Sequence, residues 1–159
     1  MSSITSAYIA FLREHFRLDW DGIHGASHWA RVRANGLLLA EQTGADTGVV
    51  ELFAFVHDVE RYSDTSDSEH GDRAACLAAD INDEFFGLSP SRLNTLMKAC
   101  EGHSHGRITG DATVITCWDA DRLDLGRVGI RPIPQKLCTS AAKQHTMIEW
   151  AYQRALRDD

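Results

Sequence analysis

Apolar residues recur along this chain three and four positions apart, the spacing that places them on one face of a helix. No segment shows the strict alternation of apolar and polar residues that a half-buried strand requires. The spacing predicts helices over residues 3–16, 23–43, 46–56, 70–86, 90–100, 112–125 and 136–157. The chain is therefore expected to be all-α, a compact bundle of six or seven helices.

Residues that favour helix ends and turns divide these segments. Gly44 and Gly87 stand just after predicted helices, where glycine suits a left-handed C-cap, and residues 46–56 are apolar on nearly every side, so this helix should be central. Ser89 followed by Pro90 is typical of an N-cap and the first helical position. Loops are expected over residues 62–69, 101–111 and 126–134. With no internal repeat or linker, we expect a single domain over residues 1–159.

The bulk composition excludes several classes of protein. The 159 residues are 43% hydrophobic and carry a formal net charge of −7 with histidine neutral, which argues against general nucleic-acid binding. No uncharged apolar run approaches the roughly 20 residues that cross a bilayer, and the N-terminus lacks the basic and apolar regions of a signal peptide. We therefore expect a cytoplasmic protein with no membrane partner.

The cysteines offer no metal or redox motif. Cys76, Cys100, Cys117 and Cys138 are widely spaced and form no C-x-x-C pair. We expect them to be buried, reduced thiols. Metal ligands are therefore sought among histidines and carboxylates.

His57 and Asp58 stand side by side at the end of the apolar stretch, within the sequence ELFAFVHDVER. Buried polar side chains need partners, so other parts of the chain should supply them. His28 and Asp121 are the candidates, each in a predicted helix. A His/His/Asp/Asp set suits a divalent ion such as manganese, magnesium, iron, nickel, cobalt or zinc. Fewer than six protein ligands would leave open positions for water and substrate.

The histidines also have simpler explanations. His24 and His28 are four residues apart and could form a solvated pair on one helix face, or Gly25 could place His24 before the helix begins. His103 and His105 lie in a glycine-rich segment and could be exposed.

The aspartates near Asp121 have a simpler explanation as well. Asp119, Asp121 and Asp124 could form a salt-bridged helix face with Arg122. Asp119 and Asp121 are two residues apart, so on a regular helix only one of them can point at a given site. The combination of the His-Asp doublet with these separate candidates is stronger than any of its parts.

Five motifs occur in one order, namely HGASHWARV, HDVER, EHG, GHSH and DADRLDLGRVG. Over about residues 21–130 they resemble the HD-domain metal-dependent phosphohydrolase superfamily. The resemblance implies an all-helical fold that holds a metal through His28, His57, Asp58 and Asp121. Binuclear members carry further histidines between the doublet and the last aspartate, where this chain has His70 and His103, with His105 as an additional candidate. One or two divalent ions are therefore implied.

The same resemblance implies hydrolysis of a phosphoester, on a nucleotide or another small phosphorylated metabolite, by metal-activated water. Asp58 would bind metal and orient the water, and Arg61 or Arg122 would hold a phosphate oxygen. Two other classes stay open: a di-iron HD-type oxygenase, and a regulatory module that binds metal or nucleotide without turnover. The chain lacks the GYP motif of HD-type cyclic-dinucleotide phosphodiesterases, and its segment 129–134 departs from many small members. The substrate, the oligomeric state and the role of His24 stay open at this point.

Overall fold

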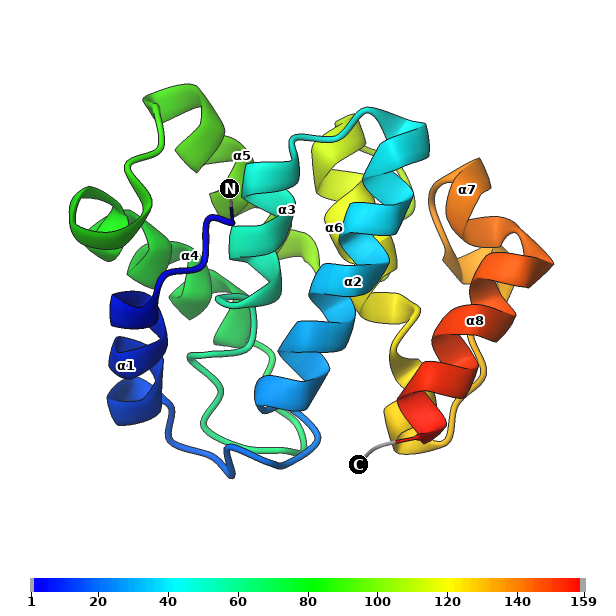
Figure 1. Cartoon of the computed structure of the whole chain (residues 1–159), viewed down its shortest axis with the longest axis horizontal. Helices are drawn as coiled ribbons and strands as arrows, with labels where there is room; N and C mark the ends of the chain where they lie inside the picture. Colours follow the sequence, from blue (N-terminus) through cyan, green and yellow to red (C-terminus); the bar gives the residue numbers. More distant parts are fainter. Residues whose placement is uncertain (1, 158–159) are drawn as a thin grey trace.

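A computed structural model describes residues 2–157 and shows eight α-helices and no strand within them (Figure 1). The predicted all-α class is confirmed. The α-helices are α1 (Ser6–His15), α2 (Ala26–Thr43), α3 (Thr47–Ala54), α4 (His70–Ile81), α5 (Pro90–Gly102), α6 (Ala112–Arg122), α7 (Ser140–Lys143) and α8 (His145–Leu156). A π-helical turn, η1 (Asn82–Phe86), extends α4, and two 3-10 helices, η2 (Leu125–Val128) and η3 (Pro134–Lys136), lie between α6 and α7.

Helix α3 is the centre of the bundle, as its apolar sequence predicts. It packs against α2, α5 and α6 (Figure 1). Every residue from Val49 to Ala54 is buried, Glu51 included, whose carboxylate accepts a hydrogen bond from Arg33 at 2.7 Å. Gly36 on α2 permits the close approach of these two helices, because a Cβ there would lie 2.4 Å from Val50 Cγ1. The central position of α3 brings its C-terminal end into the middle of the molecule.

The helix ends predicted at Gly44, Gly87 and Ser89 are confirmed. Gly44 and Gly87 adopt left-handed conformations with φ of 71° and 60°, which end α2 and the π-helical turn. The hydroxyl of Ser89 accepts a hydrogen bond from the amide of Arg92, and Pro90 is the first residue of α5.

The single closing helix predicted over residues 136–157 is wrong, and so is the count of six or seven. The chain is extended at Gln144, with φ −64° and ψ 133°, so α7 and α8 are separate. Residues 137–139 cannot join a helix because the buried Asp119 carboxylate accepts hydrogen bonds from the amides of Cys138 and Thr139, at 2.7 and 2.8 Å. A carboxylate nineteen residues away therefore overrides the local helical pattern.

Helix α3 ends at Ala54, earlier than predicted. His57 and Asp58 follow it in a series of turns, in which the amide of His57 donates to Phe53 O at 3.0 Å and the amide of Arg61 donates to Asp58 O at 3.1 Å. Helix α6 likewise ends at Arg122, before the predicted Leu125. Both ends lie close to candidate ligands, so the site combines ligands from helices with ligands from turns.

The prediction of four buried thiols is wrong for two of them. All four cysteines are free, and Cys100 and Cys117 are buried, but Cys76 is exposed and Cys138 is half-buried. Burial raises the pKa of the Cys100 thiol.

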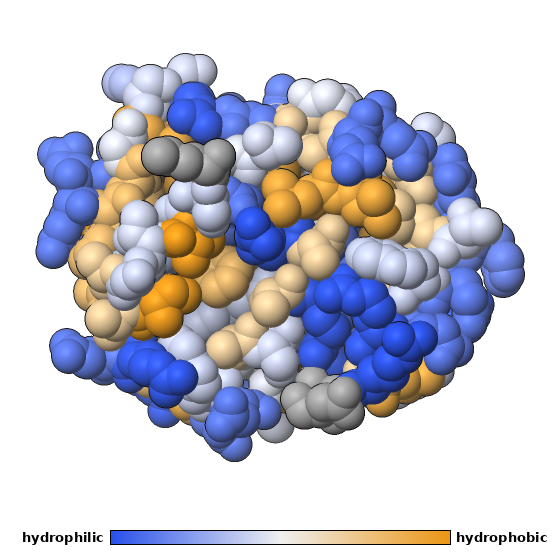
Figure 2. Space-filling model, viewed as in Figure 1, coloured by the Kyte–Doolittle hydropathy of each residue, from blue (hydrophilic) through white to orange (hydrophobic). Residues whose placement is uncertain are grey.

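The C-terminal helices cover one side of the bundle. Helices α7 and α8 both pack directly on α2, and α8 also packs on η2, so the last two helices contact the bundle as well as the segment that follows α6 (Figure 1). The face drawn in Figure 2 carries small hydrophobic groups interrupted by hydrophilic ones. Among the described residues, no helix has the length and apolar character that crossing a bilayer would need.

Candidate metal centre

Three segments bring the four predicted ligands to one point. His28 lies on α2, His57 and Asp58 follow α3, and Asp121 lies on α6. The Nε2 atoms of His28 and His57 are 3.2 Å apart. Asp58 Oδ2 lies 3.4 Å from each of these nitrogens, and Asp121 Oδ1 lies 3.3 Å from His28 Nε2 and 3.5 Å from His57 Nε2. Such spacings suit atoms that share one ion at about 2.0–2.2 Å.

The other oxygen of Asp58 belongs to a second group. Oδ1 lies 3.2 Å from Nε2 of His70 on α4 and 3.5 Å from Nε2 of His103 at the end of α5. These two imidazole nitrogens are 2.8 Å apart. Asp58 therefore stands between two histidine pairs, with one carboxylate oxygen on each.

The turns after α3 explain how neighbouring residues reach one site. In a regular helix the side chains of His57 and Asp58 would point about 100° apart. Here the helix has ended, and both side chains point into the same buried space, where His57 is 0% and Asp58 2% exposed. A polar site of this depth is stable only if its groups find partners.

Each of the four histidines has its other ring nitrogen fixed. Nδ1 of His57 donates to Phe53 O at 3.0 Å, Nδ1 of His103 donates to Cys100 O at 2.6 Å, and Nδ1 of His70 donates to Asp67 O. Nδ1 of His28 donates to Asp124 Oδ2 at 2.7 Å. With the proton held on Nδ1, every Nε2 can present a lone pair to the centre, which is the arrangement that histidine ligands require.

Electrostatics of the centre favour a cation. Burial alone would lower the pKa of His57, but the carboxylates of Asp58 and Asp121 outweigh it and raise that pKa to about 10. Burial alone would raise the pKa of Asp58, but His57 and His103 hold it well below its usual range. Burial lowers the pKa of His103, so its neutral form is favoured. Buried anionic carboxylates among oriented imidazoles fit one or two divalent ions.

The remaining predicted site residues lie differently. Arg61 donates from Nε to Asp58 Oδ1 at 3.2 Å and thus lies beside the centre. Arg122 points to the end of η3, where it donates to Lys136 O at 3.1 Å. His105 is exposed, and the structure does not bring it to the six convergent side chains. Its role as a ligand is not supported by this placement.

The structure also decides between the competing explanations for His24 and Asp119. His24 precedes α2, with Gly25 as the N-cap, and its Nδ1 lies 2.7 Å from Asp64 Oδ1. The ring centroids of His24 and His28 are 6.4 Å apart, and His24 is not among the convergent ligands. Asp119 faces away from the centre and holds the start of α7, so only Asp121 of that pair reaches the centre.

Two residues that support the site were not predicted from the sequence. Asp124 is fully buried, and its second oxygen accepts a hydrogen bond from Nε of Arg31 at 2.7 Å. Asp124 follows Asp121 by three residues, so on a helix it would share a face with the ligand, and this spacing was a usable signal. Arg31 follows His28 by three residues and gave the same kind of signal.

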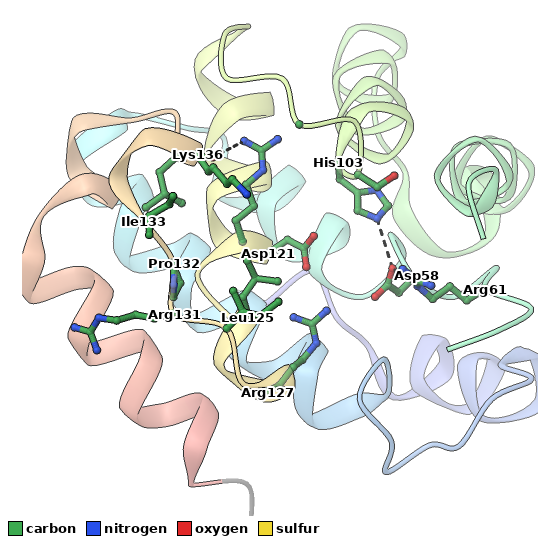
Figure 3. A pocket seen from close by; sticks show the side chains of 15 residues that line it. Asp58, Arg61, His103, Asp121, Leu125, Arg127, Arg131, Pro132, Ile133 and Lys136 are labelled. Atoms are coloured by element: carbon green, nitrogen blue, oxygen red, sulfur yellow. Dashed lines mark hydrogen bonds and ion pairs between the residues drawn. The ribbon is translucent and has the colours of Figure 1, made fainter. Parts of the chain in front are cut away.

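A cavity of about 620 Å³ opens onto the centre (Figure 3). Asp58, His103 and Asp121 line it from the bundle, and residues 122–137 form the facing wall. In Figure 3 the Arg127 side chain points into the cavity, whereas Arg131 turns toward α8, where it pairs with Glu149. The lining includes the cationic residues Arg61, Arg122, Arg127, Arg131 and Lys136, and the apolar residues Leu125, Ile130, Pro132, Ile133 and Leu137.

Comparison with known proteins agrees with this geometry. No protein-family model and no curated protein matches the sequence. A solved structure, described as a predicted HD superfamily hydrolase from an uncultured Thermotogales bacterium, matches with a TM-score of 0.70 and 25% sequence identity, over 92% of this chain and 84% of that chain. The shared fold, together with the motifs that converge on His28, His57, Asp58 and Asp121, shows that the chain belongs to the HD-domain superfamily.

Proposed function

We propose that this protein is a metal-dependent phosphohydrolase that acts on a nucleotide or another small phosphorylated metabolite. One observation carries the proposal: Asp58 places one oxygen on each of two histidine pairs, at the floor of a cavity whose walls carry five cationic side chains. A hydrolase role is also in keeping with the description of the structural neighbour.

The bound metal would supply Lewis-acid activation of a water molecule and of a phosphoryl oxygen. His28, His57, Asp58 and Asp121 would hold one ion, and His70 and His103, with the other oxygen of Asp58, would hold a second. Asp58 lines the cavity in addition to being one of the expected metal ligands, so it is the residue that would orient the attacking water.

Charge distribution supports an anionic substrate. The chain as a whole has a net charge of −7, yet the cavity wall is rich in arginine and lysine. Arg61 is held against Asp58 and by the carbonyls of Ser63 and Thr65, at 3.2 and 3.3 Å, so its guanidinium stays beside the centre. It would hold a phosphoryl oxygen with little loss of conformational freedom.

A direct test measures metal content and turnover together. Purified protein is stripped with a chelator, reloaded separately with manganese, cobalt, magnesium, nickel, zinc or iron, and assayed on panels of phosphomonoesters and phosphodiesters. We expect turnover with at least one ion, and its loss in Asp58→Ala. The exposed His105→Ala is the matched control and should keep its activity.

The other outcomes identify the alternatives. Iron as the resident metal, with an absorption change on exposure to oxygen and no phosphoester turnover, would favour a di-iron oxygenase. Metal binding without turnover of any phosphoester or reaction with oxygen would favour a regulatory module. Either result would exclude the proposed hydrolysis.

A further inference from the structure

At the end of the cavity formed by residues 122–137, two cations have no counter-ion among residues 2–157. We propose that Arg122 and Lys136 form a second anion subsite, so that the natural substrate carries a further anionic group besides the phosphoester beside Asp58. The inference rests on the proposed function and extends it to the substrate class, a phosphoester that also bears a second phosphate or a carboxylate.

Arg122 is held in place, but no carboxylate among the described residues neutralises its charge. Its Nη1 donates to Lys136 O and lies 3.3 Å from Cys138 Sγ, and its guanidinium lies 5.6 Å from the centroid of the Trp118 ring. None of these contacts is with a carboxylate. Its Nη2 is buried and has no hydrogen-bond partner among the described residues. Arg122 therefore offers a positioned and uncompensated positive charge to the cavity.

Lys136 adds a second charge at the same end. It is exposed and lines the cavity, and within residues 2–157 its ammonium group forms neither an ion pair nor a hydrogen bond. Its backbone carbonyl is the acceptor of Arg122, so the two residues are neighbours. Figure 3 shows Lys136 on the opposite side of Asp121 from Arg127.

The other cavity cations have partners already. Arg61 is paired with Asp58, and Arg131 with Glu149. Arg127 forms an ion pair with Asp124, whose Oδ2 lies 4.0 Å from Nη1, and it donates to Ile23 O at 2.9 Å and to Asp124 O at 3.0 Å. A phosphate bound only beside Asp58 would leave the Arg122 and Lys136 charges uncompensated, whereas a second anionic group on the substrate would neutralise them.

The cavity wall near Arg122 and Lys136 is apolar. This composition indicates the character of the part of the substrate that connects its two anionic groups. Ile130 and Ile133 line the cavity and are 53% and 45% exposed. Exposed isoleucines in a cavity favour contact with an apolar ligand surface. The part of the substrate between its anionic groups is therefore expected to be at least partly apolar.

A series of alkane bisphosphonates with one to six methylene groups tests the proposal, because the affinity should depend on the distance between the two phosphonates. Their dissociation constants are measured by calorimetry on manganese-loaded protein and compared with that of methylphosphonate. We expect one chain length to bind about tenfold tighter than methylphosphonate, because only that length brings the second phosphonate to Arg122 and Lys136. A series in which no length exceeds methylphosphonate by more than twofold would overturn the subsite.

Variants identify the residues responsible. Lys136 is exposed, so Lys136→Gln should fold normally. This variant should lose most of the difference in affinity between the best bisphosphonate and methylphosphonate, while its dissociation constant for methylphosphonate should stay within about twofold of native. Lys143→Gln, an exposed lysine on α7, is the control for charge and should change neither constant. If Lys136→Gln and Arg122→Gln both keep the full advantage, the subsite is wrong.

This binding experiment is independent of the test of hydrolysis. If the protein binds methylphosphonate but the length series is flat, the subsite fails and the phosphohydrolase proposal stands. If the series has a maximum that depends on Lys136 but no phosphoester is hydrolysed, the subsite stands and the proposed catalysis fails.

Discussion

Nδ1 of His28 donates a hydrogen bond to Oδ2 of Asp124 at 2.7 Å, although 96 residues separate them in the chain. Oδ1 of the same carboxylate accepts from Nε of Arg31, also at 2.7 Å. Both His28 and Asp124 are fully buried. The Asp124 carboxylate thus fixes both the tautomer and the ring orientation of His28, a candidate metal ligand.

Asp124→Asn should weaken metal binding without removing any ligand. The amide has the same shape but carries no charge, and it can direct an N–H toward His28 Nδ1, so the ring is held less well. Loss of such a supporting carboxylate typically lowers metal affinity by about 10–100-fold. Competition with a chromophoric chelator measures this change. The exposed Asp80→Asn should keep the native affinity, and a native affinity in Asp124→Asn would contradict the assigned role.

The helical periodicity and the glycine and Ser-Pro signals predicted most of the bundle correctly because those signals act locally. Gly44, Gly87 and Ser89 end or begin helices through their own backbone and side chain. The break before α7 could not be predicted this way, since it depends on the distant carboxylate of Asp119.

The same distinction between local signals and distant contacts applies to the candidate site. The histidines and aspartates that converge were all predicted, because the residue types of metal ligands are few and their order is distinctive. The Arg31 partner of Asp124 was not predicted, because 93 residues separate these two side chains and only packing brings them together. His105 was proposed on sequence alone, and its exposed position could not be known before the loop was placed.

Metal stoichiometry should separate the two groups of ligands. His70→Ala removes a ligand of the second group only, so the bound metal should fall from about two ions to about one. His57→Ala should reduce occupancy of the first group, and Asp58→Ala should affect both because each of its oxygens serves one pair. Elemental analysis of the purified variants measures these counts.

His105→Ala is the matched control for this series, since it removes an exposed imidazole that lines a surface pocket together with His70. We expect it to retain the native metal content. A native protein that binds one ion, with His70→Ala unchanged, would show that the His70 and His103 pair does not hold metal.

Acid should destabilise the N-terminal end of α3 through Asp46. Arg92 pairs with this carboxylate and, with the amide of Val49, holds the pKa of Asp46 below its ordinary value of 3.8. A depressed folded-state pKa gives stability that is present above pH 3.8 and is lost as the pH falls through the folded pKa. Because the pair is partly exposed, its contribution should be small, about 0–1 kcal/mol.

Asp46→Asn isolates this effect, since asparagine can still cap the helix but cannot form the ion pair. Urea unfolding is measured at pH 7 and pH 3 on protein stripped of metal with a chelator. At pH 7 the native protein should have a slightly larger free energy of unfolding than Asp46→Asn, and at pH 3 this difference should be smaller. High salt at pH 7 should also reduce the difference. A difference that grows on acidification would contradict the sign of this prediction.

Gly71 allows α4 to approach the chain segment that carries His103. A Cβ at this position would lie 2.4 Å from the carbonyl oxygen of Cys100 and 3.3 Å from His103 Nδ1. That carbonyl is the acceptor that orients the His103 ring, so Gly71→Ala should displace both. We expect a loss of about 1–3 kcal/mol in the free energy of unfolding, as for other forced overpacking, and weaker binding of the second ion only.

Gly48→Ala tests whether this effect belongs to the site or to any glycine substitution in a helix. Its added Cβ would lie 2.6 Å from Arg92 Nη2, 3.3 Å from Asp46 Oδ1 and 3.4 Å from Ser3 Oγ. The nearest of these atoms is the end of a flexible side chain, which can move aside. Stability of Gly48→Ala should therefore stay near native and both ions should bind, as judged by urea unfolding and elemental analysis. If Gly71→Ala keeps native stability and two ions, the close packing of α4 on the His103 segment is not what positions the second pair. If it loses the second ion and keeps the first, Gly71 is required because only a residue without Cβ leaves the Cys100 carbonyl free to hold His103.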